Sequence, residues 1–136
     1  MASSVDRRRF GLIAALVADA GCIVVFAAIG RRSHDESEGL GGVLATAAPF
    51  LVGLALGWAL VEALRRSRSR PTDPVRLDAG VVIWVVTVAA GLLLRRTLWD
   101  RGTALAFVIV ATAFLGLAIV GWRAAYDRFR RSRSHA

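Results

Sequence analysis

The stretch TALAFVIVATAFLGLAIVGW, residues 103–122, contains twenty residues and no charged side chain. A bilayer has a hydrocarbon core of ~30 Å, and a helix that rises ~1.5 Å per residue needs roughly 20 apolar residues to cross it. Similar apolar stretches occupy residues 10–29, 43–64 and 79–94, and 56% of the 136-residue chain is hydrophobic. The sequence therefore predicts an all-α membrane protein: one domain, residues 1–136, folded as a four-transmembrane-helix bundle.

The distribution of arginine predicts how this bundle is oriented. All 18 basic residues are arginines, and the formal net charge is +8. Thirteen of them lie before the first span, in the linker 65–78 and in the tail 123–136, whereas the two remaining loops contain five. Because positive charge accumulates in cytoplasmic segments, we expect both termini in the cytoplasm and two antiparallel hairpins in the inner (cytoplasmic) membrane.

The same layout bears on the class of function. Nearly all of the chain lies in or against the membrane, so no soluble catalytic or nucleic-acid-binding domain is expected. The spans contain no nucleophile–base pair or phosphate-binding glycine loop, and we expect neither enzymatic activity nor a cofactor. A loop with His34 and three acidic residues has no second histidine or cysteine nearby, and we expect no metal there. The expected partners are membrane lipids, with anionic headgroups on the cytoplasmic side, and either a second copy or another membrane protein.

Asp19 is the main candidate for a functional residue, because it lies near the middle of the first span. A carboxylate at that depth costs at least ~2.5–3.5 kcal/mol, so Asp19 is predicted to face the bundle interior. Thr87 and Thr112 reach a similar depth and Cys22 lies one turn away, which predicts an intramembrane polar layer. Three roles remain open for Asp19: an interhelical hydrogen bond, which asparagine could also form; a proton or cation relay or ligand contact; or an ion pair with a partner subunit.

Four arginines at the predicted outer ends of the spans form a second candidate, Arg31, Arg32, Arg95 and Arg96. The third span has only 16 apolar residues before Arg95, so part of this group is expected below the headgroups. The arginines either extend to lipid phosphates or form a basic cluster at the outer mouth of the bundle that attracts an anion.

The second span contains three residues that affect helix geometry. Pro49 removes a backbone hydrogen bond and predicts a kink, and the freed carbonyl either binds a ligand or accepts a bond from a neighbouring hydroxyl. Gly53 and Gly57 have the G-x-x-x-G spacing, which favours close helix packing within the bundle or in a homodimer.

A weak internal repeat relates the two hairpins. A shift of 64 residues superposes three short motifs: Arg31-Arg32 on Arg95-Arg96, Phe50-Leu51 on Phe114-Leu115, and Gly57-Trp58 on Gly121-Trp122. The repeat reflects either the shared constraints of a membrane or descent from one hairpin. Descent would imply a pseudo-twofold axis along the membrane normal.

Several short motifs together resemble a known family. They are Asp19, Ile29-Gly30-Arg31 with His34, Ala48-Pro49-Phe50, Gly91 through Arg95, Phe107 and Gly121-Trp122-Arg123. With them the chain resembles small four-span prokaryotic membrane proteins grouped as a domain of unknown function, which implies a bundle without an assigned activity. A looser likeness links it to small multidrug transporters, whose first span has a glutamate. The expected function is non-catalytic binding of lipid or a partner protein; the alternative is a small proton- or cation-coupled transporter that uses Asp19.

Overall fold

The structure, a computed structural model, describes residues 4–32, 39–67, 73–98 and 104–133. Within these ranges the chain forms four helices and no strand: α1 (Ser4–Arg32), α2 (Gly39–Ser67), α3 (Leu77–Thr97) and α4 (Leu105–Arg133). Each helix is long and apolar enough to cross a membrane. Even the 21 residues of α3 measure about 31 Å at ~1.5 Å per residue. The prediction of an all-α, four-span membrane protein is confirmed.

Helices are the expected structure for these stretches because lipid offers the backbone no hydrogen-bonding partner, and a helix satisfies its own amides. The helices also continue past the apolar stretches. α1 begins at Ser4 rather than at residue 10, and α4 continues to Arg133 rather than ending at residue 122. Arginine is a good helix former, so these polar ends extend the helices beyond the hydrocarbon.

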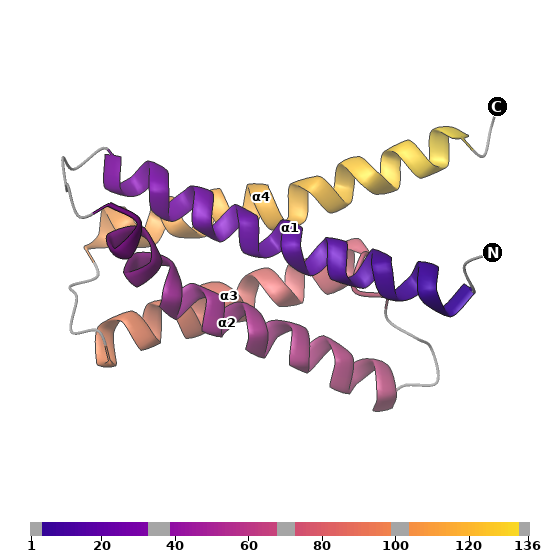
Figure 1. The fold of residues 1–136 in the computed structure, drawn as a ribbon, viewed down its shortest axis with the longest axis horizontal. Coiled ribbons are helices and arrows are strands. Elements are labelled where there is room, and N and C mark those ends of the chain that lie inside the picture. Colours follow the sequence, from indigo (N-terminus) through magenta and orange to yellow (C-terminus); the bar gives the residue numbers. More distant parts are fainter. Residues whose placement is uncertain (1–3, 33–38, 68–72, 99–103, 134–136) are drawn as a thin grey trace.

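The four helices form a ring in chain order, with neighbours antiparallel (Figure 1). Contacts join α1 to α2, α2 to α3, α3 to α4 and α4 to α1. The short connection between α3 and α4 makes these two helices neighbours, as the sequence predicted. The two ends of the bundle are named for use below. The terminal end is the one where α1 and α3 begin and where α2 and α4 finish. The other is the opposite end.

Glycines bring α2 and α3 close together. A Cβ atom on Gly53 would lie 2.6 Å from the Thr87 carbonyl oxygen, and one on Gly57 would lie 3.1 Å from the Ile83 carbonyl oxygen. Both glycines are buried, so the G-x-x-x-G face packs inside this bundle. Of the two uses that the sequence left open for the motif, the structure therefore has the intramolecular one.

Aromatic rings fill much of the core toward the opposite end. Phe26 of α1 packs against Phe50, Phe107 and Phe114, with ring centroids 5.6–5.9 Å apart. Pro49 is fully buried within α2, which is helical on both sides of it. The first turns of α2 are angled against the rest of the helix in Figure 1.

Candidate functional site

Asp19 lies at the centre of a polar cluster inside the bundle. Its side chain has no exposed surface. The preference of a carboxylate for the protein interior over lipid explains this orientation, because a charge facing the acyl chains would have no partner. The position of Asp19 along α1 thus fixes which face of that helix turns inward.

The partner of Asp19 is Arg123, which the sequence analysis had assigned to the cytoplasmic tail. Arg123 is also fully buried. Its Nη1 donates to Asp19 Oδ1 over 2.7 Å, and its Nη2 donates to Asp19 Oδ2 over 2.8 Å. Two parallel bonds of this kind match the planar guanidinium to the planar carboxylate. The two charges compensate each other where neither could remain alone.

Arg123 reaches Asp19 because of the direction of its helix. Helical side chains point toward the N-terminus of their own helix, so Arg123 on α4 points back from the terminal end into the bundle. Gly80 of α3 leaves the space it needs, since a Cβ atom there would lie 2.4 Å from Arg123 Cδ. Two further donors are also used: Nε donates to the Pro74 carbonyl oxygen (3.0 Å), and Nη1 donates to that of Ile119 (2.8 Å).

Two tryptophans complete the coordination of the carboxylate. Trp58 Nε1 of α2 donates to Asp19 Oδ2 over 3.0 Å, and Trp122 Nε1 of α4 donates to Asp19 Oδ1 over 2.9 Å. The Arg123 guanidinium also lies over the Trp122 ring, 4.4 Å from its centroid. Asp19 therefore accepts four hydrogen bonds, two on each oxygen. We call Asp19, Trp58, Trp122 and Arg123 the buried node.

The buried node joins every part of the bundle. Asp19 belongs to α1, Trp58 to α2, and Trp122 and Arg123 to α4, while the Pro74 carbonyl precedes α3. Chemically it is a charge-compensated ion pair in which Asp19 accepts four hydrogen bonds and Arg123 donates four. A carboxylate with four donors around it has no free site for a proton or a cation, so this arrangement suits a structural clamp better than a relay.

The other members of the predicted polar layer do not bind Asp19. Thr112 Oγ1 donates to the Val108 carbonyl oxygen of its own helix (2.7 Å), and the Thr112 carbonyl oxygen accepts from Trp84 Nε1 (3.0 Å). Thr87 is buried, and its hydroxyl forms no hydrogen bond with the described residues. Cys22 is a half-buried free thiol. The layer of one carboxyl and two hydroxyls is thus replaced by an ion pair with two indoles.

Of the four predicted outer arginines, two turn toward the bundle and two are exposed. Arg31 is buried and packs against Gly42, where a Cβ atom would lie 2.5 Å from the guanidinium carbon. Arg95 is half-buried, and its guanidinium lies 4.3 Å from the centroid of the Phe107 ring. Arg32 and Arg96 are exposed. One arginine of each adjacent pair therefore turns into the bundle. His34 and its acidic neighbours Asp35, Glu36 and Glu38 lie outside the described residues.

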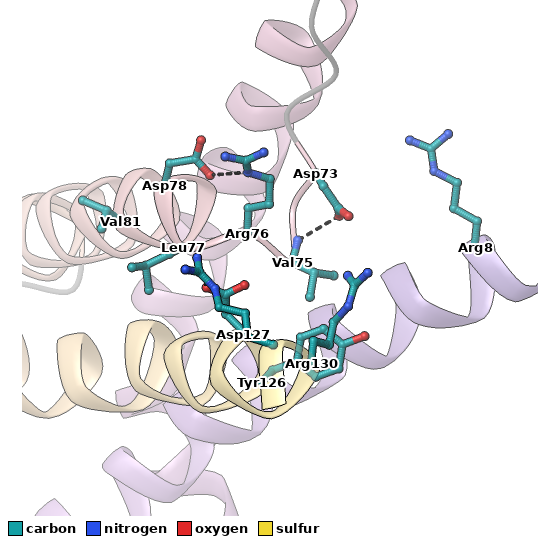
Figure 2. Close-up of a pocket in the computed structure, with 11 residues that line it drawn as sticks. Arg8, Asp73, Val75, Arg76, Leu77, Asp78, Val81, Tyr126, Asp127 and Arg130 are labelled. Carbon is teal, nitrogen blue, oxygen red and sulfur yellow. Dashed lines mark hydrogen bonds and ion pairs between the residues drawn. The ribbon is translucent and has the colours of Figure 1, made fainter. Parts of the chain in front are cut away.

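A second candidate site, which the sequence did not reveal, is an open pocket of about 980 Å³ at the terminal end. The start of α1, the segment before α3, the start of α3 and the end of α4 line it (Figure 2). Its lining combines four arginines, three aspartates and an apolar wall: Arg8, Arg76, Arg130, Arg131, Asp73, Asp78, Asp127, Val75, Leu77, Val81 and Tyr126. We call it the terminal pocket.

The two sites are adjacent. Asp73 and Val75 line the terminal pocket, while the Pro74 carbonyl between them accepts the bond from Arg123. On the other wall, Tyr126 lies one turn after Arg123 on α4. The clamp at the buried node consequently fixes two walls of the pocket relative to each other.

Comparison with known proteins identifies a family and no established activity. No curated protein and no solved structure matches the chain. A family model described as "Protein of unknown function (DUF3054)" matches residues 16–126. That range contains the whole buried node, whereas part of the terminal pocket, including Arg8 and Arg130, lies outside it. By this match over most of its length, the chain belongs to the DUF3054 family of proteins of unknown function.

Proposed function

We propose that this chain is a non-catalytic membrane protein that binds anionic lipid headgroups at its terminal end. The observation that supports this best is a band of exposed arginines just beyond the apolar parts of the helices. It comprises Arg7, Arg8, Arg9, Arg66, Arg76, Arg128, Arg130, Arg131 and Arg133. Arginines at this level meet lipid phosphates, and each contributes roughly 1 kcal/mol near an anionic surface.

The charge balance at this end of the bundle supports binding of anionic lipid. It argues against the view that the arginines serve only to form ion pairs within the protein. Three acidic residues compensate part of the charge in four ion pairs: Glu62 binds Arg65 and Arg66, Asp127 binds Arg131, and Asp78 lies 3.4 Å from Arg76. The arginines at this end nevertheless outnumber the described acidic side chains. An excess of exposed positive charge is suited to an anionic surface and is less suited to an apolar protein partner.

The geometry of α4 supports the same proposal. Trp122, Tyr126 and Phe129 follow one another at helical spacing and lie on one side of the helix. Arg130 packs over the Tyr126 ring and Arg133 over the Phe129 ring, at 5.9 and 4.5 Å from the centroids. Aromatic rings with adjacent arginines are typical of a helix at the membrane–water interface.

The alternative function, transport coupled to Asp19, finds no support in the site. A relay must bind and release a proton or cation, whereas the Asp19 carboxylate is saturated by Arg123, Trp58 and Trp122. Releasing it would leave a buried guanidinium without its counterion. Proton flux into proteoliposomes should therefore stay at the level of protein-free vesicles, and flux that Asp19→Asn abolishes would favour transport instead.

The lipid proposal can be tested by tryptophan quenching in reconstituted vesicles. Trp58, Trp84 and Trp122 lie in the halves of their helices nearer the terminal end. In a Trp99→Phe variant, which removes the remaining tryptophan, we expect brominated phosphatidylglycerol to quench the emission more strongly than brominated phosphatidylcholine at equal mole fraction. The preference should weaken as salt rises, because exposed charges are screened over ~10 Å at 0.1 M. Equal quenching by the two lipids would refute the proposal.

A further inference from the structure

Two of the four arginines of the terminal pocket are paired with a carboxylate, and the other two are not. Arg131 binds Asp127 over 2.8 Å, and Arg76 lies 3.4 Å from Asp78. Asp73 accepts a bond from the Val75 backbone N–H. Within the described residues, Arg8 and Arg130 form no ion pair with a carboxylate, and the Arg130 guanidinium lies 5.9 Å from the centroid of the Tyr126 ring. Two guanidinium groups on neighbouring helices, α1 and α4, thus remain available for an anion.

The backbone adds to this positive potential. The first turn of α3 lies at the pocket, where Arg76 is the N-cap residue and its side chain forms no capping hydrogen bond. A helix N-terminus has a partial positive charge, and α3 is long enough to have a full dipole. Asp78 offsets part of this charge, because its Oδ1 accepts a hydrogen bond from the Ala79 N–H over 2.9 Å. Figure 2 shows the Arg130 side chain extending toward the Asp73–Val75 segment, with Arg8 on α1 beyond it.

One part of the pocket wall, formed by residues of α3 and α4, is apolar. Leu77, Val81 and Tyr126 are each more than two-fifths exposed. An anion that bound only to the arginines would leave this wall without a partner. A ligand with a phosphate next to a glycerol or acyl group would contact both the arginines and the apolar wall at once.

We propose that the terminal pocket binds one phosphate ester, whose phosphate lies between Arg8 and Arg130 and whose carbon chain lies along Leu77, Val81 and Tyr126. An anionic phospholipid and a water-soluble phosphate ester share this chemistry. If the ligand is a lipid, this proposal rests on the proposed function and makes that function more specific, since one binding site replaces a diffuse basic band. If the ligand is a water-soluble phosphate ester, the proposal does not depend on the proposed function.

The test compares two pairs of neighbouring arginines. Arg8→Gln/Arg130→Gln removes both available charges from the pocket. Arg9→Gln/Arg128→Gln is the matched control, because it makes the same change in charge at exposed residues of the same helices that do not line the pocket. Native mass spectrometry of the full chain in detergent, titrated with phosphatidylglycerol, gives the number of bound lipids and the affinity of each. All four side chains are exposed, and unchanged size-exclusion profiles would verify folding.

We expect one saturable phosphatidylglycerol in the wild type, with an affinity that exceeds that for phosphatidylcholine. An arginine near an anionic group contributes roughly fivefold in affinity, so the pocket variant should bind about thirtyfold more weakly. The control variant removes two arginines of the basic band, so it should bind fewer lipids in total. Its affinity for the first lipid should change by less than about threefold, because neither residue lines the pocket. Equal losses in both variants would overturn the pocket while leaving a diffuse lipid-binding band, and hence the proposed function, intact.

A second arm of the experiment identifies the source of the phosphate. Titration with glycerol phosphate replaces the lipid by its headgroup alone. Weaker binding than that of phosphatidylglycerol would support a lipid ligand that uses the apolar wall. Binding of equal strength that the pocket variant loses would support the pocket with a soluble phosphate ester. If the pocket binds glycerol phosphate in this way but the lipid-quenching test fails, the proposed function is rejected and the pocket proposal is supported. The two proposals can therefore fail separately.

Discussion

Replacing Asp19 by asparagine should destabilise the bundle strongly, although the two side chains have nearly the same shape. The carboxylate accepts two bonds on each oxygen. In asparagine one oxygen becomes an NH₂ group, which would face one nitrogen of Arg123 and one indole N–H, so two acceptor positions are lost whichever way the amide is turned. Arg123 would also remain buried without its counterion.

The magnitude follows from that buried charge. Breaking a buried ion pair by removing one partner costs about 3–5 kcal/mol, a large part of a typical stability of about 5–15 kcal/mol. The ordinary interhelical hydrogen bond that the sequence suggested would tolerate asparagine and cost under ~2 kcal/mol. Unfolding in mixed micelles by increasing mole fractions of dodecyl sulfate would measure the difference. Tryptophan emission is a direct signal, because Trp58 and Trp122 both bind Asp19.

Two controls make the result specific to the ion pair. Asp6→Asn makes the same chemical change at an exposed position in the first turn of α1, and should alter the free energy of unfolding by no more than about 1 kcal/mol. The double variant Asp19→Asn/Arg123→Gln removes both charges, and it should lose clearly less than the two single variants combined. An Asp19→Asn protein within about 1 kcal/mol of wild type, or strictly additive losses in the double variant, would refute the reasoning.

Three further predictions follow from the same geometry. Gly80→Ala should displace the Arg123 side chain, since the new Cβ would lie 2.4 Å from Cδ, and should cost about 1–3 kcal/mol in the same unfolding assay; Gly121→Ala, with nothing within 4 Å of its Cβ, is the matched control. Trp58→Phe and Trp122→Phe should each cost about 1.5–3 kcal/mol by removing a bond to a charged group, and equal stability of either variant with wild type would argue against its indole bond. In a Cys22→Ser background, Ser132→Cys should react with an impermeant maleimide only from the cytoplasm and Leu98→Cys only from outside; reversed labelling would contradict the orientation predicted from the arginines.

The sequence was a good guide to the fold because hydropathy is a local property. Four long apolar stretches and the requirement for internal backbone hydrogen bonding predict four helices. The inward orientation of Asp19 followed in the same way, from the cost of a carboxylate in lipid. The expected cytoplasmic orientation of the termini stays a prediction, because the structure contains no membrane.

The partner of Asp19 could not be read from local properties. Arg123 follows Trp122 at the end of an apolar stretch, where an arginine ordinarily binds headgroups. Its burial depends on the direction of its side chain along α4 and on the space left by Gly80, and both are tertiary facts. A signal was nevertheless present: a buried carboxylate requires a counterion, and every arginine among the described residues lies near a helix end. Thr87 and Thr112 matched Asp19 in depth alone, which does not establish a contact.

The internal repeat gains meaning from the structure. Trp58 and Trp122 are equivalent under the 64-residue shift, and they bind the two oxygens of the same carboxylate. Phe50 and Phe114 are equivalent as well, and both pack against Phe26 of α1, at 5.8 and 5.6 Å. Membrane constraints alone place aromatic residues at certain depths, yet they do not require matching residues of α2 and α4 to contact the same residues of α1.

This symmetry also explains why the buried node is a single site. The shift maps Asp19 of α1 onto Ile83 of α3, which is fully buried against Gly57. Two carboxylates at equivalent positions would need two counterions in one small bundle, whereas one Asp19 satisfies both tryptophans and Arg123. The hairpins are therefore alike in their aromatic residues and differ at the one charged position. Because of that difference α1 forms hydrogen bonds to both α2 and α4, whereas α3 packs closely on α2 through glycine.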